Sequence, residues 1–205
     1  MSDTPEDIPL FPLSSVLFPH ARMPLQIFEQ RYLDMIKSCA RSGTGFGVIW
    51  TSGGGEVAGR GEPQLGEYGT YARIVDYDQL PNGLLGVTIE GGERFDLHGA
   101  ERLASQLIMG SVTFREALPP TPVQPEWEGL VAVLQSLETH PHVEQLQLQI
   151  DHGNAWAVAC NLLQLLPIDE RLKYRWLGYD SVEDVMLELD TLLNEISGED
   201  DTPEA

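Results

Sequence analysis

The sequence has few cations and no long apolar run. Its 205 residues include 12 Lys and Arg against 32 Asp and Glu, giving a formal net charge of -20 and a pI of about 4.3. So few cations cannot neutralise many phosphates, and we expect no binding of nucleic acid or of an anionic membrane surface. The chain also lacks a run of about 18 apolar residues that could span a bilayer, and residues 1–7 lack the basic and apolar regions of a signal peptide. These features predict a cytoplasmic protein.

Cysteine is scarce as well. Cys39 and Cys160 lie far apart and match no metal-binding or redox spacing, and a small secreted fold built on disulfides would carry more cysteine. Both fall on apolar stretches of expected helices, so we expect reduced, buried and inert thiols. With 42% hydrophobic residues the chain has enough apolar material for a core, which argues against global disorder.

A proline-rich segment divides the chain into two parts. Residues 118–125 include four prolines, which exclude a helix and favour an extended connector. Residues 1–120 carry 9 basic and 15 acidic side chains, whereas residues 121–205 carry 3 and 17. We expect a β-rich subdomain over 1–120, a helical subdomain over 121–198 and a disordered acidic tail over 199–205.

The first part is typical of short strands joined by turns. Alternating side chains over 71–77, the turn Pro81-Asn82-Gly83 and the run 84–89 predict a β-hairpin. Consecutive strands of this kind predict an antiparallel sheet curled into a barrel or sandwich. The other expected elements are a helix from Glu29 to Arg41, strands at 46–50, 93–97 and 107–114, and turns at 53–55 and Gly91-Gly92.

The second part is typical of a helical bundle. Apolar residues recur at spacings of three and four along 182–196, and Ser181 with Asp184 has the pattern of a capping box. The predicted fold class is therefore α+β: an antiparallel, barrel-like β part with one inserted helix, followed by a helical bundle packed on itself and on the β part. Further helices are expected around 130–137, 143–150, 155–166 and 169–176.

The sequence contains no motif for nucleotide binding or nucleophilic catalysis. Glycines at 43–47 and 59–66 lack the strand-to-helix order and the Lys-Ser/Thr pair of a phosphate-binding loop. No nucleophile elbow and no Cys/His signature occurs. We therefore expect no catalytic residue and no cofactor.

One cluster has side chains that suit a metal ion. His140, His142 and Glu144 lie close in sequence, followed by Asp151 and His152, and histidine and carboxylate are ligands that zinc accepts. The spacing is not diagnostic, and His-Pro-His between two helices favours a solvated turn. We expect no metal, and a metal-dependent hydrolase using His140 and His142 stays as an alternative hypothesis.

The cations of the second part form a small cluster beside aromatic residues. Arg171, Lys173 and Arg175 flank Tyr174 and Trp176. Such a cluster could stack on bases and contact phosphates. We favour instead ion pairs with neighbouring acids and with the acidic last helix.

The N-terminal segment has an unusual pattern of apolar residues and prolines. Residues 8–13 are Ile-Pro-Leu-Phe-Pro-Leu, residues 16–19 are Val-Leu-Phe-Pro, and residues 23–32 are Met-Pro-Leu-Gln-Ile-Phe-Glu-Gln-Arg-Tyr. This pattern predicts an apolar strand with prolines at its edges, a turn, a second strand and a helix that begins at Glu29. It closely resembles the opening of the N-terminal, substrate-binding domain of the ATP-dependent Lon proteases.

Two further elements resemble the same family: Gly-Thr-Tyr-Ala-Arg-Ile at 69–74 and Gly-Glu-Arg-Phe at 92–95. The resemblance covers roughly residues 8–197 and implies a PUA-like β part with a helical bundle behind it. Lon proteases continue into an ATPase module and a Ser/Lys protease module, and no residues of this sequence match either. The resemblance therefore implies a stand-alone, non-catalytic recognition domain.

The resemblance also implies a partner, namely polypeptide or unfolded protein segments bound in an adaptor or chaperone-like role. Binding could use apolar grooves or strand addition at a sheet edge. Phe18, Phe28, Arg31 and Tyr32 are weak candidates for the binding surface, and the competing interpretation places them in the core and in ion pairs. RNA binding through the PUA-like part is suggested by fold analogy and opposed by charge. The oligomeric state stays open.

Overall fold

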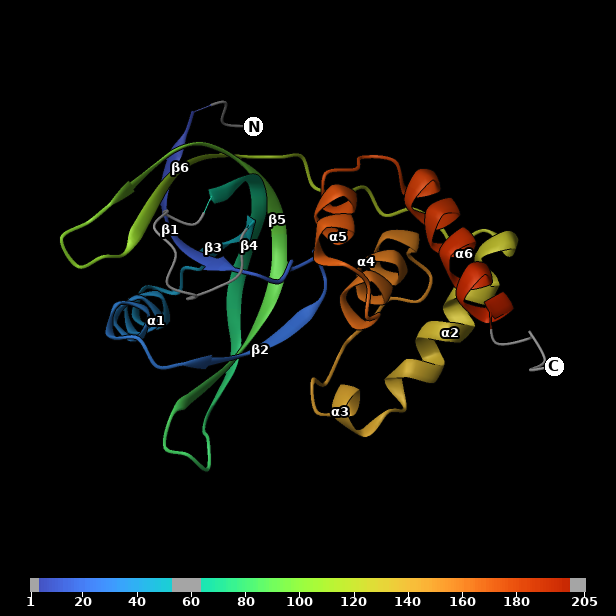
Figure 1. The fold of residues 1–205 in the computed structure, drawn as a ribbon, viewed down its shortest axis with the longest axis horizontal. Coiled ribbons are helices and arrows are strands. Elements are labelled where there is room, and N and C mark those ends of the chain that lie inside the picture. Colours follow the sequence, from blue (N-terminus) through green and yellow to red (C-terminus); the bar gives the residue numbers. More distant parts are fainter. Residues whose placement is uncertain (1–3, 53–63, 200–205) are drawn as a thin grey trace.

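The computed structural model describes residues 4–52 and 64–199, which form a sheet-bearing half beside a helical half (Figure 1). This arrangement confirms the α+β class. The strands are β1 (Glu6–Leu13), β2 (Arg22–Ile27), β3 (Phe46–Ser52), β4 (Gln64–Gln79), β5 (Leu85–Arg102) and β6 (Ile108–Phe114). The helices are α1 (Gln30–Ser42), the 3-10 turn η1 (Pro125–Trp127), α2 (Glu128–Glu138), α3 (Pro141–Glu144), α4 (Ala155–Leu165), α5 (Glu170–Leu177) and α6 (Val182–Glu199).

The six strands form one sheet that closes into a barrel-like ring. Their order is β2-β5-β4-β3-β1-β6, and an additional pairing of β5 with β6 completes the ring. β2 lies outside it, paired with the first part of β5. The expectation of a wholly antiparallel sheet is wrong at one place, because β1 and β3 run parallel. Such a pair requires a crossover connection, which β2 and α1 supply.

The prolines of β1 lie where the strand has a neighbour on one side only. β1 pairs with β6 over residues 6–10 and with β3 over residues 10–13. Pro9 falls in the first ladder and Pro12 in the second, so each has one side without a strand neighbour, where the missing N–H is tolerated. The second strand expected before the helix is found as β2, which begins at Arg22, and residues 16–19 form a buried loop ahead of it.

Local turn signals are accurate at two positions. Gly83, with φ 81°, turns the predicted hairpin from β4 into β5. Gly43, with φ 67°, ends α1 in the left-handed conformation that favours glycine. The expected turn at 53–55 lies outside the described residues.

The expected turn at Gly91-Gly92 is wrong, because β5 continues through both glycines. The register shifts there from Thr70 opposite Arg94 to Ala72 opposite Gly91, which is a β-bulge. A Cβ at Gly91 would lie 2.1 Å from the carbonyl oxygen of Phe18. The glycine is therefore required by the close approach of the loop before β2, and not by a chain reversal.

The helical half matches the predicted pattern except at one element. The expected helix over 143–150 is wrong, since α3 ends at Glu144 and Gln147 has φ 48°. The apolar residues of this segment, Leu146, Leu148 and Ile150, alternate and form no stripe at helical spacing. Elsewhere α4 is buried along almost its whole length, and α2, α5 and α6 pack around it. Within the described residues, no helix has the length and apolar character needed to cross a membrane.

The two halves are joined by the loop before β2, residues 16–21. Val16, Phe18 and Ala21 belong to the apolar cluster of the helical half. The backbone of the same loop bonds to helix side chains: Glu170 accepts from the Val16 N–H at 2.7 Å and Gln164 accepts from the Phe18 N–H at 3.0 Å. The apolar cluster of the helical half thus includes side chains from the β half.

The buried amide of Asn161 gives a test of this junction. Its Nδ2 donates to the carbonyls of His20 (3.2 Å) and Ala157 (2.9 Å). We expect Asn161→Ala to lower the free energy of unfolding by about 1–3 kcal/mol in urea titrations, because it leaves a carbonyl without its donor. The control is Asn194→Ala, on the exposed face of α6, with a change within about 0.5 kcal/mol. Equal effects of the two variants would contradict the role given to Asn161.

Candidate functional site

A cleft of about 330 Å³ opens where the sheet faces the connector to the helices. Its size falls in the range of about 300–1,000 Å³ usual for ligand sites. Three stretches of chain far apart in sequence meet there: the loop before β2, the middle of β4 and β5, and the connector after β6. The cleft is lined by Pro19, His20, Arg73, Glu90, Gly91, Gly92, Glu93, Arg94, Glu116, Ala117 and Leu118.

The cleft lies at a gap in the strand pairing of β5. Along one edge, β5 pairs with β2 up to Glu90 and with β6 from Phe95 onward. Between these ladders, Gly91 exchanges bonds with the loop before β2, donating to Ala21 and accepting from His20. The exposed residues Gly92 and Glu93 have no neighbouring strand on this edge. The gap therefore leaves a short stretch of strand edge facing the cleft.

The walls of the cleft carry charges of both signs. Glu90 pairs with Arg22 at 2.8 Å across β2 and β5. Within the described part of the chain, no ion pair or side-chain hydrogen bond involves Arg73, Glu93 or Glu116, and all three are exposed. The open charges of the cleft are thus one guanidinium and two carboxylates.

His20 shapes one wall through an uncommon backbone conformation. Its φ is 62°, in the left-handed region that few residues other than glycine adopt. The conformation is held from both sides, since the His20 N–H donates to Gly91 and its carbonyl accepts from Asn161. The imidazole is thereby held exposed at the edge of the cleft.

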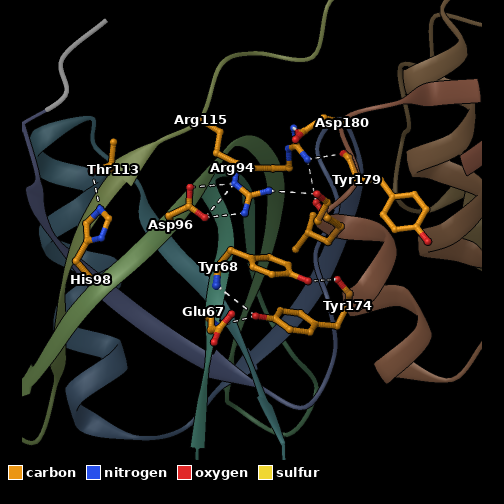
Figure 2. A network of polar contacts seen from close by, with 12 residues as sticks. Glu67, Tyr68, Arg94, Asp96, His98, Thr113, Arg115, Tyr174, Tyr179 and Asp180 are labelled. Carbon is orange, nitrogen blue, oxygen red and sulfur yellow. Dashed lines mark hydrogen bonds and ion pairs between the residues drawn. The ribbon is translucent and has the colours of Figure 1, made fainter. Parts of the chain in front are cut away.

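Arg94 lines the cleft and also joins the helices to β5 through the contacts drawn in Figure 2. Only 5% of this residue is exposed. Its guanidinium donates to the carbonyls of Leu177 (3.0 Å) and Tyr179 (2.6 Å) and to the carboxylate of Asp180 (2.6 Å). Its Nε is buried without a hydrogen-bond partner. One donor of this guanidinium is therefore unsatisfied.

A second set of contacts fixes the same junction farther along the sheet (Figure 2). Arg115 pairs with Asp96 at 2.6 Å and lies over the ring of Tyr68, 4.9 Å from its centroid. Tyr68 stacks on Tyr174 of α5 with centroids 4.3 Å apart, and its hydroxyl donates to the Tyr174 carbonyl. The Tyr174 hydroxyl accepts from the backbone of Glu67 and Tyr68. The position of α5 on β4 is thus specified by stacking and hydrogen bonding together.

The four residues expected to bind a partner lie outside the cleft lining. Phe18 is 1% exposed in the core shared with the helices, and Tyr32 is buried against Phe11, with ring centroids 4.2 Å apart. Arg31 pairs with Glu29 at 2.6 Å and donates to the Gln106 carbonyl. Phe28 alone is largely exposed, at 61%. The structure does not bring the four together into one surface.

The histidines of the expected metal cluster have contacts of their own. His140 caps α3 by accepting from the backbone of His142 at 3.4 Å, and His152 pairs with Glu138 at 2.7 Å. Residues 4–52 and 64–199 hold no group of three or more His, Cys, Asp or Glu side chains placed to bind a metal ion. Nothing in these ranges therefore supports the metal-dependent alternative.

The cysteines and the cationic cluster behave as the sequence predicts. Both thiols are buried and unpaired, and burial raises the pKa of Cys160 to about 12. Lys173 pairs with Glu170 at 3.4 Å, and Arg175 pairs with Glu188 of α6 at 2.6 Å. Ion pairs rather than an open basic patch are confirmed for these two cations.

The residues of the cleft were not singled out from the sequence as a site. A signal was present, since residues 92–95 belong to an element that resembles the Lon family. The other walls come from the loop before β2 and from the connector, and only the strand register brings them to β5. The pattern of residues within one segment does not show which distant segments lie beside it in the fold.

Comparison with known proteins identifies one family. The family model described as the ATP-dependent protease La (LON) substrate-binding domain matches residues 7–183. A Lon protease of Parabacteroides distasonis is 26% identical over 136 residues, and one of Porphyromonas gingivalis is 27% identical over 135 residues. Each match covers 64% of this chain and 16% of the relative, so the chain corresponds to a small part of these proteases.

Solved structures match over nearly the whole chain. A Lon N-terminal domain protein from Xanthomonas campestris is 30% identical with a TM-score of 0.70, covering 91% of this chain and 98% of that one. The N-terminal domain of a Mycobacterium avium complex Lon protease has a TM-score of 0.57 at 14% identity, covering 90% and 96% of the two chains. At 14% identity, the similarity to the Mycobacterium avium complex domain shows a shared fold alone.

Replacing Arg94 tests how the helices are held. We expect Arg94→Lys to lower the free energy of unfolding by about 1–3 kcal/mol, because a single ammonium cannot serve two carbonyls and a carboxylate at once. Amide hydrogen exchange in α5 and α6 should become faster. The exposed Arg41→Lys, at the end of α1, is the control and should change neither quantity. Unchanged exchange in α5 and α6 of Arg94→Lys would contradict the fastening role.

The tyrosine stack predicts a fall in stability at alkaline pH. Burial, with the neighbouring Tyr174 second, raises the pKa of Tyr68 from its ordinary value near 10 to about 12. The contribution of Tyr68 to the free energy of unfolding is fully present below pH of about 10, where its hydroxyl is protonated in both the folded and the unfolded chain. It is lost as pH rises through about 12, because the hydroxyl ionises at a lower pH in the unfolded chain than in the folded one. Urea titrations across this range should show a shallower fall for Tyr68→Phe than for the unchanged protein. If the free energies of unfolding of Tyr68→Phe and of the unchanged protein fell equally with pH, the raised pKa of Tyr68 would be contradicted.

Proposed function

Because the chain belongs to the family of the ATP-dependent protease La (LON) substrate-binding domain, we propose that it recognises polypeptide segments and catalyses no reaction itself. The substrate-binding domain fold supports a substrate-recognition module. Neither the matched family model nor the matched structures include an ATPase or protease domain. The adaptor or chaperone-like role expected from the sequence belongs to this proposal.

The cleft at the middle of β5 is the proposed binding site. The observation that carries this assignment is the stretch of β5 edge at Gly92 and Glu93, which faces the cleft without a neighbouring strand. An extended segment of another chain would occupy the place of the missing strand, as in recognition by strand addition. The cleft thus suits the backbone of an extended polypeptide.

The charge of the protein supports a polypeptide partner over a nucleic acid. The formal net charge is -20, and two of the three open charges of the cleft are carboxylates. Phosphate groups would be repelled from such a surface. Lys173 and Arg175, the cations next to the aromatic residues of α5, are engaged in ion pairs.

Filling the cleft from Gly92 tests the site. A Cβ at this position meets only the Tyr71 carbonyl, at an ordinary 3.4 Å, so Gly92→Leu should fold normally and project its side chain into the cleft. We expect the affinity for unstructured, fluorescently labelled peptides of mixed sequence to fall at least about tenfold, the equivalent of about 1.4 kcal/mol, as measured by fluorescence anisotropy.

The matched control is Gly129→Leu. A Cβ on this glycine of α2 has no neighbour within 4 Å, so the same side chain is added in open space. Peptide affinity should stay at the level of the unchanged protein. Retained binding in Gly92→Leu would place the site elsewhere, with exposed Phe28 as the next candidate. Failure of every peptide to bind the unchanged protein would refute polypeptide recognition.

A further inference from the structure

The second half of β4 has a strand neighbour on one side only. β3 pairs with β4 no farther than Ala72, whereas β5 pairs with it as far as Gln79. The hairpin that joins β4 to β5 extends away from the barrel-like ring (Figure 1). Within the described residues, no strand pairs with the other edge of residues 73–79. We call this stretch the free edge of β4.

The free edge of β4 carries side chains that favour strand pairing. Val75 and Tyr77 are 41% and 70% exposed, and β-branched and aromatic residues are enriched in strands. Residues 73–79 are also as long as an ordinary strand of about 5–6 residues. An uncovered edge of this length and character is a template for pairing with another chain.

The backbone of the hairpin shows which N–H groups of this edge point away from β5. Just beyond β4, the Leu80 N–H donates to the Leu84 carbonyl at 2.9 Å. Residues of an antiparallel pair alternate between positions that bond across the ladder and positions that face away from it. The register has no shift between Asp76 and Gln79. The N–H groups of Tyr77 and Gln79 therefore point outward, to the free edge.

Both outward N–H groups are already bonded, each to the aspartate that precedes it. The Tyr77 N–H donates to Oδ1 of Asp76 at 2.9 Å, and the Gln79 N–H donates to Oδ1 of Asp78 at 2.7 Å. A carboxylate is a stronger acceptor than the carbonyl oxygen that an incoming strand would offer. An incoming strand would have to displace both carboxylates and place its own carbonyl oxygens beside them.

A bulge at Val75 adds a second obstacle to pairing. The register with β5 shifts between Ile74 and Asp76, so Val75 has no partner on β5. Bulges bend an edge and increase its twist, which works against regular pairing with another strand. The regular part of the free edge is thus reduced to residues 76–79, where the two aspartates lie.

We infer that Asp76 and Asp78 close the free edge of β4 to strand addition and so keep a second copy of this chain from pairing there. In such a pairing, the aspartates of the two copies would also approach one another across the new ladder, which is unfavourable for like charges. The inference goes beyond polypeptide recognition, because it concerns association of the chain with itself and requires no ligand.

Removing the two carboxylates tests this inference. We expect the double variant Asp76→Ala with Asp78→Ala to self-associate at concentrations at least about tenfold lower than the unchanged protein does, because both outward donors become available to a second copy. The measurement is sedimentation velocity over a series of protein concentrations. An alanine double variant that sediments as the unchanged protein does throughout the series would overturn the inference.

The matched control is the double variant Asp34→Ala with Asp190→Ala. It removes the same two charges from exposed positions on α1 and α6. This control should sediment as the unchanged protein does. If it associated as strongly as the variant of β4, the cause would be the lower net charge, and the inference would be overturned.

Asparagine separates the hydrogen bonds from the charge. The double variant Asp76→Asn with Asp78→Asn loses both charges and keeps an oxygen that can accept from the same N–H groups. We expect it to associate far less than the alanine double variant. Equal association of the two would contradict the role given to the hydrogen bonds and leave charge repulsion as the cause.

Proline at position 77 shows where the association takes place. Because the Tyr77 N–H points away from β5, Tyr77→Pro removes a donor of the free edge and no bond between β4 and β5. Added to the alanine double variant, it should restore the sedimentation of the unchanged protein. Association that persists in this triple variant would place the contact outside the free edge of β4 and overturn the inference.

Discussion

The buried backbone of residues 16–21 is the constraint on which the remainder of the molecule depends. All of these residues except the exposed His20 are buried, and none belongs to a strand, so their N–H and C=O groups need partners other than a sheet ladder. Glu170, Gln164 and Asn161 of the helical half supply part of them. Thr70 and Gly91 of the sheet supply bonds to Leu17, His20 and Ala21. The loop is therefore bonded to both halves, and the helices complete their core with side chains from that loop. Residues 16–21 thus connect the two halves by both packing and hydrogen bonds.

The same constraint produces the cleft. The loop approaches β5 so closely that only glycine fits at position 91, and beyond that contact it turns away into β2. β6 reaches β5 from the other end and stops at Phe95. The gap between them stays open, because β2 and β6 pair with different parts of β5. As the proposed site, the cleft is built on strands and on Arg94, whose side chain is fixed by three bonds, so we expect it to require little ordering when a ligand binds.

Local chemistry decided which elements the sequence could predict. The hairpin at Asn82-Gly83 and the end of α1 at Gly43 depend on a few neighbouring residues, and both are found as expected. The prediction of a turn at Gly91-Gly92 was wrong because a glycine needed for close packing cannot be distinguished in sequence from one needed to reverse the chain direction. The cleft could not be predicted at all, because its walls meet through the register of β5 with its neighbouring strands, which local sequence does not specify.

The N-terminal motif identifies the fold and says little about the ligand. Leu10 lies in the core inside the ring, and Phe11 lies in the core under α1, so neighbouring residues of one strand serve two separate clusters. A strand with both faces buried must be apolar throughout, which explains why the segment is recognisable in sequence. The side chains of this segment are buried in the two clusters, so they are not available to a partner. Under the proposed function, discrimination between ligands falls to the polar residues around the gap in β5, where the side chains of Arg73, Glu93 and Glu116 are open to solvent.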